Sequence, residues 1–465
     1  MSQRYDLIVV GGGPGGYIAA IRAAQLGFET ALVEREQLGG VCLNWGCIPT
    51  KALLKGAEIA HTLTAMGNFG FSADNIQFDL SKLVAHSRNV AGRLTSGIDF
   101  LMKKNGISVI SGTAVVSDKC QLTVTNDGNN KSIYQADHII LATGARARAL
   151  PGIEFDGEYI WGAREAMTPV ELPGRLLVIG SGAIGVEFSS LYSDLGSDVM
   201  VVEILDRILP AEDAEISAAA QQAFLKRGIT IHTSTGVESL QIDNGEVAVT
   251  LKDRQGQLIP CVFDRVIVAA GIAGNIENLG LEELGVNTER GFIVTDDYCR
   301  TNLVGLYAIG DVAGPPCLAH KASHEGVLCV EKIAGLETHP LKPEQVPGCT
   351  YSRPQIASVG LTESQAKDRG HALRVGRFHY GANGKALAIG DSDGFVKTVF
   401  DADSGELLGA HMIGPDVTEQ IQGYGIGRTL ETTETELMAS VFPHPTLSEA
   451  MHEAVLDAYG RALHQ

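Results

Sequence analysis

The order of apolar and polar residues follows one design in two long stretches of the chain. Each stretch begins with an apolar run typical of a buried strand, passes through a GxGxxG motif and continues with apolar residues at helical spacing. It then stops at a glycine and ends in a second apolar run closed by a carboxylate. The stretches are LIVVGGGPGGYIAAIRAAQLGFETALVERE, residues 7–36, and LLVIGSGAIGVEFSSLYSDLGSDVMVVEILD, residues 176–206. This repeat predicts two strand–helix–strand units of one kind.

The spacing inside the two units is identical. In each unit the first glycine of the motif lies 16 residues before the glycine that ends the helix and 23 residues before the carboxylate. These residues are Gly11, Gly27 and Glu34 in the first unit and Gly180, Gly196 and Glu203 in the second. A motif in this context predicts dinucleotide binding, because the helix amino terminus attracts a pyrophosphate and the carboxylate binds ribose hydroxyls. Glu203 also repels a 2′-phosphate, so the second dinucleotide is predicted not to be NADP.

The three glycines of each motif have separate predicted tasks. The first forms a tight turn, the second lets the backbone approach the pyrophosphate, and the third allows close packing of the helix. They are Gly11, Gly13 and Gly16 in the first unit and Gly180, Gly182 and Gly185 in the second.

Each unit is followed by alternating polar and apolar residues with turn signals, which predict a small antiparallel meander. The meanders are expected at residues 115–135 and 237–257. Each leads into a strand that ends in a turn of small residues, HIILATGA and RVIVAAGI, so Gly144 and Gly271 close equivalent halves.

Charge and composition exclude several classes of partner. The formal net charge is −19, which argues against nucleic acid or an anionic membrane surface. The amino terminus runs directly into a strand and a glycine turn, and the uncharged stretch at residues 7–21 is too short to span a bilayer. We therefore expect a cytoplasmic protein. No Cys/His cluster has the spacing of a zinc site, so no metal is predicted.

Two of the eight cysteines, Cys42 and Cys47, stand apart because they are only five residues from each other, within GGVCLNWGCIPTK. In a regular helix, Cα atoms five residues apart are about 8.6 Å from each other, farther than a disulfide tolerates. A bond between them therefore needs a distorted helix or a turn. Strained disulfides are the easily reduced ones, so the pair is a candidate redox couple.

Several motifs together resemble those of the flavin-dependent disulfide oxidoreductases. They are GGGPGG with Glu34, GGxCxNxGCxPxK at residues 39–51, ATG at 142–144, the second GxGxxG, YAIGD at 307–311 and HPTLSE at 444–449. Within that family, the chain is most similar to the members that oxidise a dihydrolipoyl group with NAD. The resemblance implies FAD at the first unit, NAD at the second and Asp311 on the ribityl chain of the flavin.

The fold class that follows is α/β, with two Rossmann-like dinucleotide-binding domains in a glutathione-reductase-like arrangement and a C-terminal α+β dimerisation domain. The expected divisions are 1–147 for the first part of the FAD domain, 148–271 for the NAD domain, 272–345 for the second part of the FAD domain, and 346–465 for the dimerisation domain. The proline-rich segment at 338–348 marks the last junction.

Thiol–disulfide exchange needs a thiolate, so a base is required close to the attacked sulfur. His444 is the candidate, because it lies beside a proline and five residues before Glu449, a carboxylate able to orient the ring. The resemblance implies that this dyad acts in the active site of the other subunit of a homodimer.

The remaining roles also follow from the resemblance. It implies that Cys42 exchanges with substrate, that Cys47 contacts the flavin, and that Lys51 lies near the flavin N5 and pairs with Glu187. The implied partners are a lipoyl-bearing acyltransferase subunit or a glycine-cleavage carrier protein. Taken singly, each of these residues also has an ordinary structural interpretation, and only their joint occurrence favours the catalytic one.

Alternative functions and departures from the pattern remain. Another flavin disulfide reductase, similar to glutathione or mercuric reductase, is disfavoured by Glu203 and by a carboxyl end without a cysteine pair. A mainly structural peripheral subunit is the alternative from another class.

The chain departs from the family pattern at three places. Many relatives have a segment with Arg and Pro where this chain has GIAGN, at 271–275. Some relatives have a second histidine where this chain has Phe442 and Pro443, and Trp45 is bulkier than the usual valine.

Overall fold

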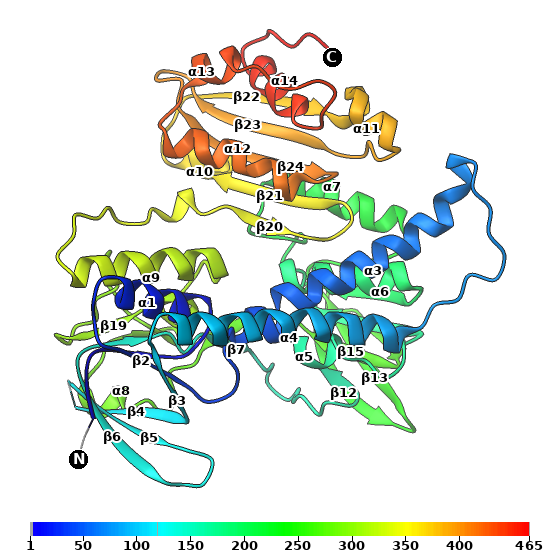
Figure 1. Ribbon diagram of the computed structural model, residues 1–465. Helices are drawn as coiled ribbons and strands as arrows, with labels where there is room; N and C mark the ends of the chain where they lie inside the picture. The colour runs from blue at the N-terminus through cyan, green and yellow to red at the C-terminus, as the bar shows by residue number, and fades with distance from the viewer. Residues whose placement is uncertain (1–2, 119, 465) are drawn as a thin grey trace. The chain divides into compact units, whose positions relative to one another are not determined.

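The computed structural model describes residues 3–118 and 120–464, and the chain divides into two compact units. The first consists of Met1–Leu53, Ser81–Arg148 and Gly271–Leu341. The second consists of Leu54–Leu80, Ala149–Ala270 and Lys342–Gln465. Segments far apart in the sequence therefore join within each unit (Figure 1). The four-part domain division expected from the sequence stays a prediction.

A mixed sheet of strand order β3–β2–β1–β6–β5–β4 forms the centre of the first unit, and β19 pairs with the last residues of β6. The strands are β1 Gln3–Val10, β2 Thr30–Glu34, β3 Ser108–Ser111, β4 Thr113–Asp118, β5 Gln121–Thr125, β6 Lys131–Leu141 and β19 Leu306–Ala308. β5 pairs antiparallel with both β4 and β6, as the predicted meander requires, and the other strand pairs of this sheet are parallel.

The helices of this unit are α1 Pro14–Gln25, α2 Gly40–Trp45, α4 Leu80–Lys104, α8 Leu281–Leu284 and α9 Ala319–Ile333, with the 3₁₀ turn η2 Gly310–Ala313. Short strand pairs are formed by β7 Ala145–Ala147 with β16 Ile272–Gly274 and by β17 Thr288–Glu289 with β18 Phe292–Ile293. α1 and α9 lie side by side along the sheet (Figure 1).

Both faces of this sheet are buried, as expected for parallel strands that read as continuous apolar runs. Leu7 and Val9 of β1 belong to a core shared with α1, α4 and α9, whereas Ile8 and Val10 belong to a second core shared with β4 and β5. The glycine turn after β1 is thereby held between two packed layers, which fixes the start of α1.

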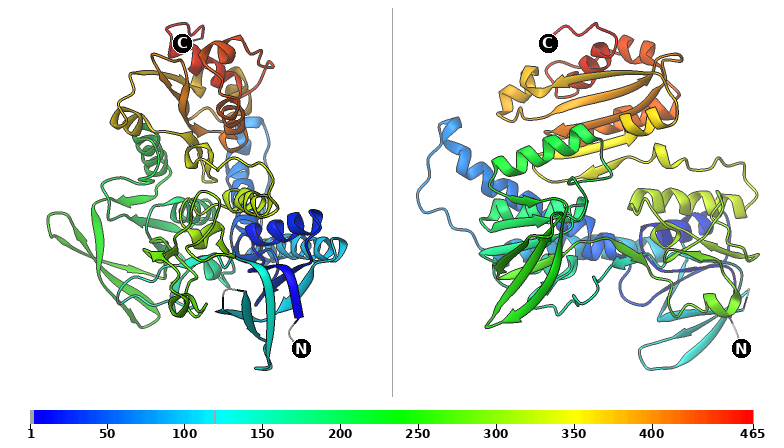
Figure 2. Two further views of the ribbon diagram at one scale, coloured as in Figure 1. Left: turned by 90° about the vertical axis from the view of Figure 1, so that its left-hand side faces the viewer. Right: turned by 180° about the vertical axis from the view of Figure 1, so that it is seen from behind.

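The second unit contains a parallel sheet of order β11–β10–β9–β15–β8. Its strands are β8 Ile160–Trp161, β9 Arg175–Ile179, β10 Asp198–Val202, β11 Thr230–His232 and β15 Arg265–Val268, and the meander consists of β12 Thr235–Asp243, β13 Glu246–Asp253 and β14 Leu258–Phe263. Figure 2 shows this meander extending from the parallel sheet of the same unit. The helices are α5 Ala163–Ala166, α6 Ala183–Leu195 and α7 Ala214–Lys226.

The carboxyl-terminal part of the second unit is an antiparallel sheet of order β20–β21–β24–β23–β22. Its strands are β20 Gly348–Thr350, β21 Gln355–Gly360, β22 Leu373–His379, β23 Phe395–Asp401 and β24 Leu407–Gly414. The helices are α10 Glu363–Asp368, α11 Gly384–Ile389, α12 Val417–Thr429, α13 Glu434–Ala439 and α14 Glu449–Asp457, with 3₁₀ turns η3 Pro343–Gln345 and η4 Tyr380–Ala382. α12 and α14 share a core with one face of the sheet.

The helix α3, Cys47–Ala65, links the two units, and the 3₁₀ turn η1, Met66–Phe69, follows it. None of the helices that the structure describes is long and apolar enough to cross a membrane.

A charged cluster lies on the other face of the antiparallel sheet, where Lys397 of β23 is only 2% exposed. Its Nζ lies 2.8 Å from Asp213 Oδ1, 2.7 Å from Glu215 Oε1 and 2.8 Å from Glu363 Oε2. Arg377 adds a two-pronged contact to Glu215, at 2.6 and 2.7 Å. Since Asp213 caps the amino terminus of α7, the cluster joins α7 to the antiparallel sheet. We call these five residues the Lys397 cluster.

We expect the Lys397 cluster to make stability depend on acid pH. The hydrogen bond from Arg377 is the largest cause that lowers the pKa of Glu215 to about 2. Because the folded pKa lies below the unfolded one, this contribution is present above about pH 4.5 and is lost as the pH falls toward about 2. The unfolding temperature should therefore drop across this window, and Glu215→Gln should make the drop shallower.

The control is Glu154→Gln, an exposed glutamate of the same unit outside the cluster. Glu212 acts in the opposite direction, because burial raises its pKa, so the difference between the two variants isolates Glu215. Parallel acid profiles for Glu215→Gln and Glu154→Gln would contradict the prediction.

Candidate functional site

The two glycine motifs have the same geometry. Gly11 and Gly180 turn the chain with φ values of +106° and +99°, which side chains rarely adopt. A Cβ on Gly16 would lie 1.9 Å from the Gly11 carbonyl oxygen, and a Cβ on Gly185 would lie 2.0 Å from that of Gly180. Each helix therefore packs onto its own turn in a way that only glycine permits.

The middle glycines leave open space at the helix amino termini. A Cβ on Gly13 would meet nothing nearer than the Gly40 Cα at 4.0 Å, and one on Gly182 would meet nothing within 4 Å. α1 and α6 begin immediately after these glycines, so their free N–H groups and dipoles favour an anion there. The two cradles thus fit a pyrophosphate each.

The carboxylates that follow each unit are held by the turn itself. Glu34 Oε2 accepts a 2.7 Å hydrogen bond from the Gly12 N–H, and Glu203 Oε2 accepts bonds from the Ser181 N–H at 2.9 Å and hydroxyl at 2.6 Å. Because a carboxylate accepts several hydrogen bonds, both residues retain capacity for ribose hydroxyls. This arrangement fits a dinucleotide in each cradle.

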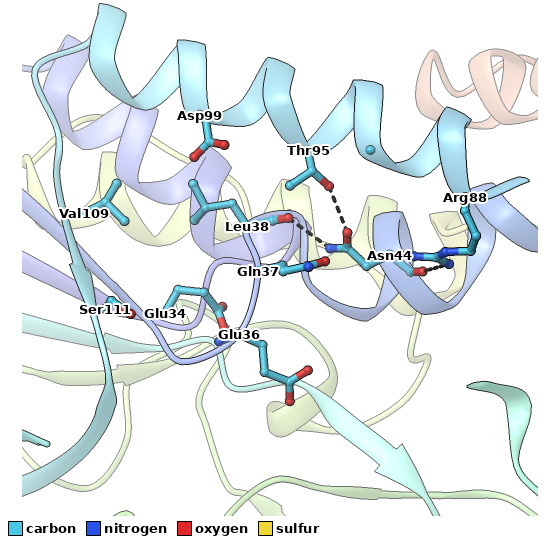
Figure 3. A pocket seen from close by; sticks show the side chains of 11 residues that line it. Glu34, Glu36, Gln37, Leu38, Asn44, Arg88, Thr95, Asp99, Val109 and Ser111 are labelled. Carbon is cyan, nitrogen blue, oxygen red and sulfur yellow. Dashed lines mark hydrogen bonds between the residues drawn. The ribbon is translucent and has the colours of Figure 1, made fainter. Parts of the chain in front are cut away.

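A cavity of about 570 Å³ adjoins Glu34 in the first unit (Figure 3). It is lined by Glu34, Glu36, Gln37, Leu38, Asn44, Arg88, Gly92, Thr95, Asp99, Val109 and Ser111. The lining combines carboxylates, at Glu34 and on α4, with the amides of Gln37 and Asn44 and with a guanidinium and a hydroxyl group on α4, which suits the adenosine end of a dinucleotide.

The two candidate redox cysteines lie on either side of a break in the helix. α2 ends at Trp45, Gly46 has φ −156° and ψ −117°, and α3 begins at Cys47. A Cβ on Gly46 would lie 3.0 Å from the Val41 carbonyl oxygen and 3.3 Å from the Cys42 Cα. The break therefore depends on glycine, and it supplies the distortion that the sequence spacing requires for a Cys42–Cys47 bond.

The side chains of Cys42 and Cys47 interact directly. A hydrogen bond with Cys47 is the largest cause that raises the pKa of the Cys42 thiol, followed by burial, while the positive charge of Lys51 opposes them. Lys51 lies one turn into α3 and is half-buried. The first unit thus brings a thiol pair and a cation together beside its dinucleotide cradle.

Asp311 is the second residue of the turn η2, which follows β19 near the carboxyl ends of the parallel strands. Burial raises its pKa, and the nearby Lys321 works against that rise. Lys321 is itself paired with Glu325 at 2.9 Å, and the Asp311 carboxylate accepts no hydrogen bond from residues 3–118 or 120–464. A half-buried acceptor of this kind fits a hydroxyl of a bound cofactor.

In the second unit, His444 and Glu449 form the expected dyad. The ring Nδ1 lies 2.9 Å from Glu449 Oε1, and Glu449 Oε2 accepts a 2.8 Å bond from the Thr446 N–H. Burial opposes the charge of Glu449, but the bonds from Thr446 and His444 outweigh it and lower its pKa. The His444 side chain is 78% exposed, so its ring is accessible from outside the chain.

Four predicted residues remain, and they form two pairs. Gly144 and Gly271 lie at equivalent places in the two halves, whereas Lys51 and Glu187 lie in different units. Gly144 and Gly271 lie in the turns that follow the last strands of the two halves, β6 and β15, with φ of +70° and +102°. Glu187 is buried in α6 and accepts a 2.9 Å bond from the Tyr351 N–H. Lys51 and Glu187 belong to different units, so their pairing stays a prediction.

Two arginines contribute contacts that sequence reasoning missed. Arg146 binds Glu277 at 2.6 Å and reaches the Gly274 carbonyl and the Asn275 side chain at 3.1 Å, so it organises the GIAGN segment. Arg88 of α4 lies over the Trp45 ring. No local sequence pattern could have predicted either contact, because the partners are far apart in the sequence.

Two family models cover most of the chain. Residues 5–326 match the pyridine nucleotide-disulphide oxidoreductase model, and residues 346–455 match the dimerisation domain of the same family. The chain belongs to the pyridine nucleotide-disulphide oxidoreductase family. Members of this family use FAD and NAD(H), which confirms the two cofactors predicted from the sequence.

Full-length relatives and solved structures agree with this assignment. Dihydrolipoyl dehydrogenase of Zymomonas mobilis is 55% identical over 465 residues, covering 100% of both chains, and that of Bacillus subtilis is 42% identical, again over 100% of both. LpdA from Mycobacterium tuberculosis superposes with a TM-score of 0.90 at 28% identity, over 97% of this chain and 99% of that one. The disulfide reductase RclA from Escherichia coli gives 0.86 at 25% identity, over 98% and 99%. The predicted fold class is confirmed.

Proposed function

We propose that the protein is a dihydrolipoyl dehydrogenase, which oxidises a protein-bound dihydrolipoyl group to the lipoyl disulfide and reduces NAD+ to NADH. The observation that carries the proposal is the helix break at Gly46, which brings Cys42 and Cys47 into direct contact in the unit that holds the first dinucleotide cradle. The substrate class is supported by the full-length relatives at 42–55% identity.

The chain offers a separate set of residues for each cofactor. Gly11, Gly13 and Gly16 form the cradle for FAD, with Glu34 at its ribose and Asp311 on its ribityl chain. For NAD, the corresponding residues are Gly180, Gly182, Gly185 and Glu203. When bound, FAD accepts an electron pair from sulfur and delivers hydride to NAD+.

Cys42, Cys47 and His444 each have a separate role in the proposed thiol–disulfide exchange. Cys42 would exchange with the substrate dithiol, and Cys47, at the amino terminus of α3, would contact the bound flavin, with Lys51 one turn further along α3. The helix amino terminus favours negative charge, which suits a thiolate at Cys47. His444 takes the proton from the substrate thiol at Nε2 while Glu449 holds Nδ1.

The exposed dyad of His444 and Glu449 would act across a homodimer interface. Residues 346–455, which contain the dyad, match the dimerisation domain, and the ring is open to an approaching partner. We assign the dyad to the active site of the other subunit. The protein partners would be a lipoyl-bearing acyltransferase subunit or a glycine-cleavage carrier protein, and the compartment would be the cytoplasm.

A steady-state assay tests substrate and cofactor together. The purified protein should reduce NAD+ with dihydrolipoamide and strongly prefer NAD+ to NADP+, because the Glu203 carboxylate would repel a 2′-phosphate and accept hydrogen bonds from free ribose hydroxyls. Faster turnover of NADPH with glutathione disulfide would refute the substrate and the cofactor assignment together.

Replacing His444 with glutamine should slow dihydrolipoamide oxidation by about 10²- to 10⁴-fold, since a positioned general base contributes that much. His371→Gln is the matched control, because its Nδ1 also binds a carboxylate, that of Asp401 at 2.6 Å, away from the dyad. Steady-state kcat/KM for dihydrolipoamide measures the effect. A loss smaller than about tenfold would remove His444 from its assigned role.

A further inference from the structure

The short helix α2, which carries Cys42, depends on neighbours for its order. It contains Gly40–Trp45, fewer than two turns, and helices of this length are not stable alone. Its last turn runs into the break at Gly46, where regular hydrogen bonding to the next turn stops. The position of Cys42 relative to Cys47 is therefore decided by whatever holds this last turn.

Side chains of α4 hold that turn at two points. Arg88 Nη1 donates a hydrogen bond to the Asn44 carbonyl oxygen, and the Arg88 guanidinium carbon lies 4.0 Å from the centre of the Trp45 ring. Thr95, two helical turns further along α4, donates a 2.9 Å bond to Asn44 Oδ1. Figure 3 shows Arg88 and Thr95 projecting from α4 toward Asn44. We call Arg88, Thr95, Asn44 and Trp45 the α4 clamp.

Asn44 completes the attachment from inside α2. Its Nδ2 donates 3.0 Å bonds to the carbonyl oxygens of Leu38 and Gly40, and the residue is buried. With Thr95 on its oxygen, every part of the amide is engaged, so the side chain has one orientation. The backbone between Cys42 and Gly46 is thereby fixed to α4.

We propose that Arg88 and Trp45 are positioning residues for the Cys42–Cys47 pair, and that the α4 clamp lowers the reduction potential of its disulfide. The inference rests on the proposed function only in treating this pair as the redox couple. A disulfide needs a narrow geometry, whereas two thiols tolerate many arrangements. A clamp that orders α2 in both states removes part of the ordering cost of forming the bond, and so favours the disulfide.

This role also explains a tryptophan between the two cysteines. A large flat ring gives the guanidinium a face to stack on, which valine cannot offer. Lysine cannot replace Arg88 either, because it lacks the planar group that stacks on the ring while donating to the Asn44 carbonyl. The variants Trp45→Val, Arg88→Lys and Arg88→Gln therefore separate stacking from charge.

The experiment measures a thiol equilibrium. The FAD-loaded protein is equilibrated with reduced and oxidised dithiothreitol at several ratios, alkylated, and the mass of the peptide with Cys42 and Cys47 is determined. Two electrons and two protons pass from dithiothreitol to the protein disulfide, which opens as dithiothreitol closes its own ring. All three variants should be reduced more easily, by roughly three- to tenfold in equilibrium constant, where tenfold corresponds to about 30 mV.

The matched control is Arg93→Lys, an exposed arginine on the same helix, which should equal the unchanged protein. If the Arg88 variants fail to fold, Trp45→Val and Thr95→Val carry the test, and both should shift in the same direction. Equilibrium constants within about twofold of the control would overturn the proposal. So would a shift in Arg88→Gln that is absent in Arg88→Lys, since it would show an effect of charge alone.

This test is independent of the proposed substrate, because dithiothreitol reduces the pair without NAD or a lipoyl group. A protein that shows the expected shifts but does not oxidise dihydrolipoamide would refute the proposed function and leave the α4 clamp in place. A pair that forms no disulfide at any dithiothreitol ratio would overturn the clamp proposal itself.

Discussion

Replacing Cys47 with serine is expected to abolish dihydrolipoamide-dependent reduction of NAD+. Serine cannot form the bond to Cys42 that the contact between the two side chains permits, so the electron pair of the substrate has no acceptor next to the flavin. The loss should be on the order of 10⁴-fold or more, as when a covalent nucleophile is removed from other enzymes. Formation of NADH, followed by its absorbance, measures it.

The control for this experiment is Cys120→Ser. Cys120 is an exposed cysteine of the same unit, outside the site, so its removal should leave turnover unchanged. Cys47→Ser should still bind FAD and remain yellow, because the cradle at Gly11 and Gly13 is untouched. Turnover of Cys47→Ser within about tenfold of the Cys120→Ser protein would refute the redox role.

Lys397→Met is expected to cause the largest loss of stability. The Lys397 side chain is 2% exposed and is the shared partner of Asp213, Glu215 and Glu363. Without it, clustered carboxylates remain with less positive charge, and removing one partner of a buried ion pair costs about 3–5 kcal/mol. Urea unfolding at neutral pH, with circular dichroism as the signal, measures the change in the free energy of unfolding.

The matched control is Lys226→Met. Lys226 also pairs with an aspartate, Asp393, at 2.9 Å, but both side chains are more than 70% exposed, so at most about 1 kcal/mol is at stake. The deficit of Lys397→Met should shrink as the pH is lowered, because its carboxylates can then take up protons. Equal unfolding midpoints for Lys397→Met and Lys226→Met would contradict the prediction, because they would show that the buried ion pairs of Lys397 stabilise the protein no more than the exposed one of Lys226.

The sequence repeat predicted the parts of the fold that depend on local chemistry. The glycines at 11 and 180 are spaced identically from their carboxylates, and the structure shows the same turn, the same helix start and the same carboxylate contact in both halves. The prediction holds in both halves because a tight turn and a close helix approach leave no room for a side chain, so each requires glycine.

The candidate site was partly accessible to the same reasoning. A bond between Cys42 and Cys47 was expected to need a distorted helix or a turn, and the structure has a helix break at Gly46. The pattern HPTLSE predicted a His444–Glu449 contact, and the two side chains lie 2.9 Å apart. Their catalytic roles stay predictions. The sequence did not indicate Arg88 as the partner of Trp45, because the two residues are 43 positions apart and an arginine on a helix usually points to solvent.

GGVCLNWGCIPTK by itself determined that a bond between Cys42 and Cys47 needs irregular backbone, since cysteines five residues apart are too distant for a disulfide in a regular helix. Only the tertiary structure decided what holds that backbone and what surrounds Lys397. Asp213 and Lys397 are 184 residues apart, and Arg88 reaches Asn44 from 44 residues away. Such contacts depend on how helices and sheets pack, and packing brings together side chains whose spacing along the chain carries no periodic signal.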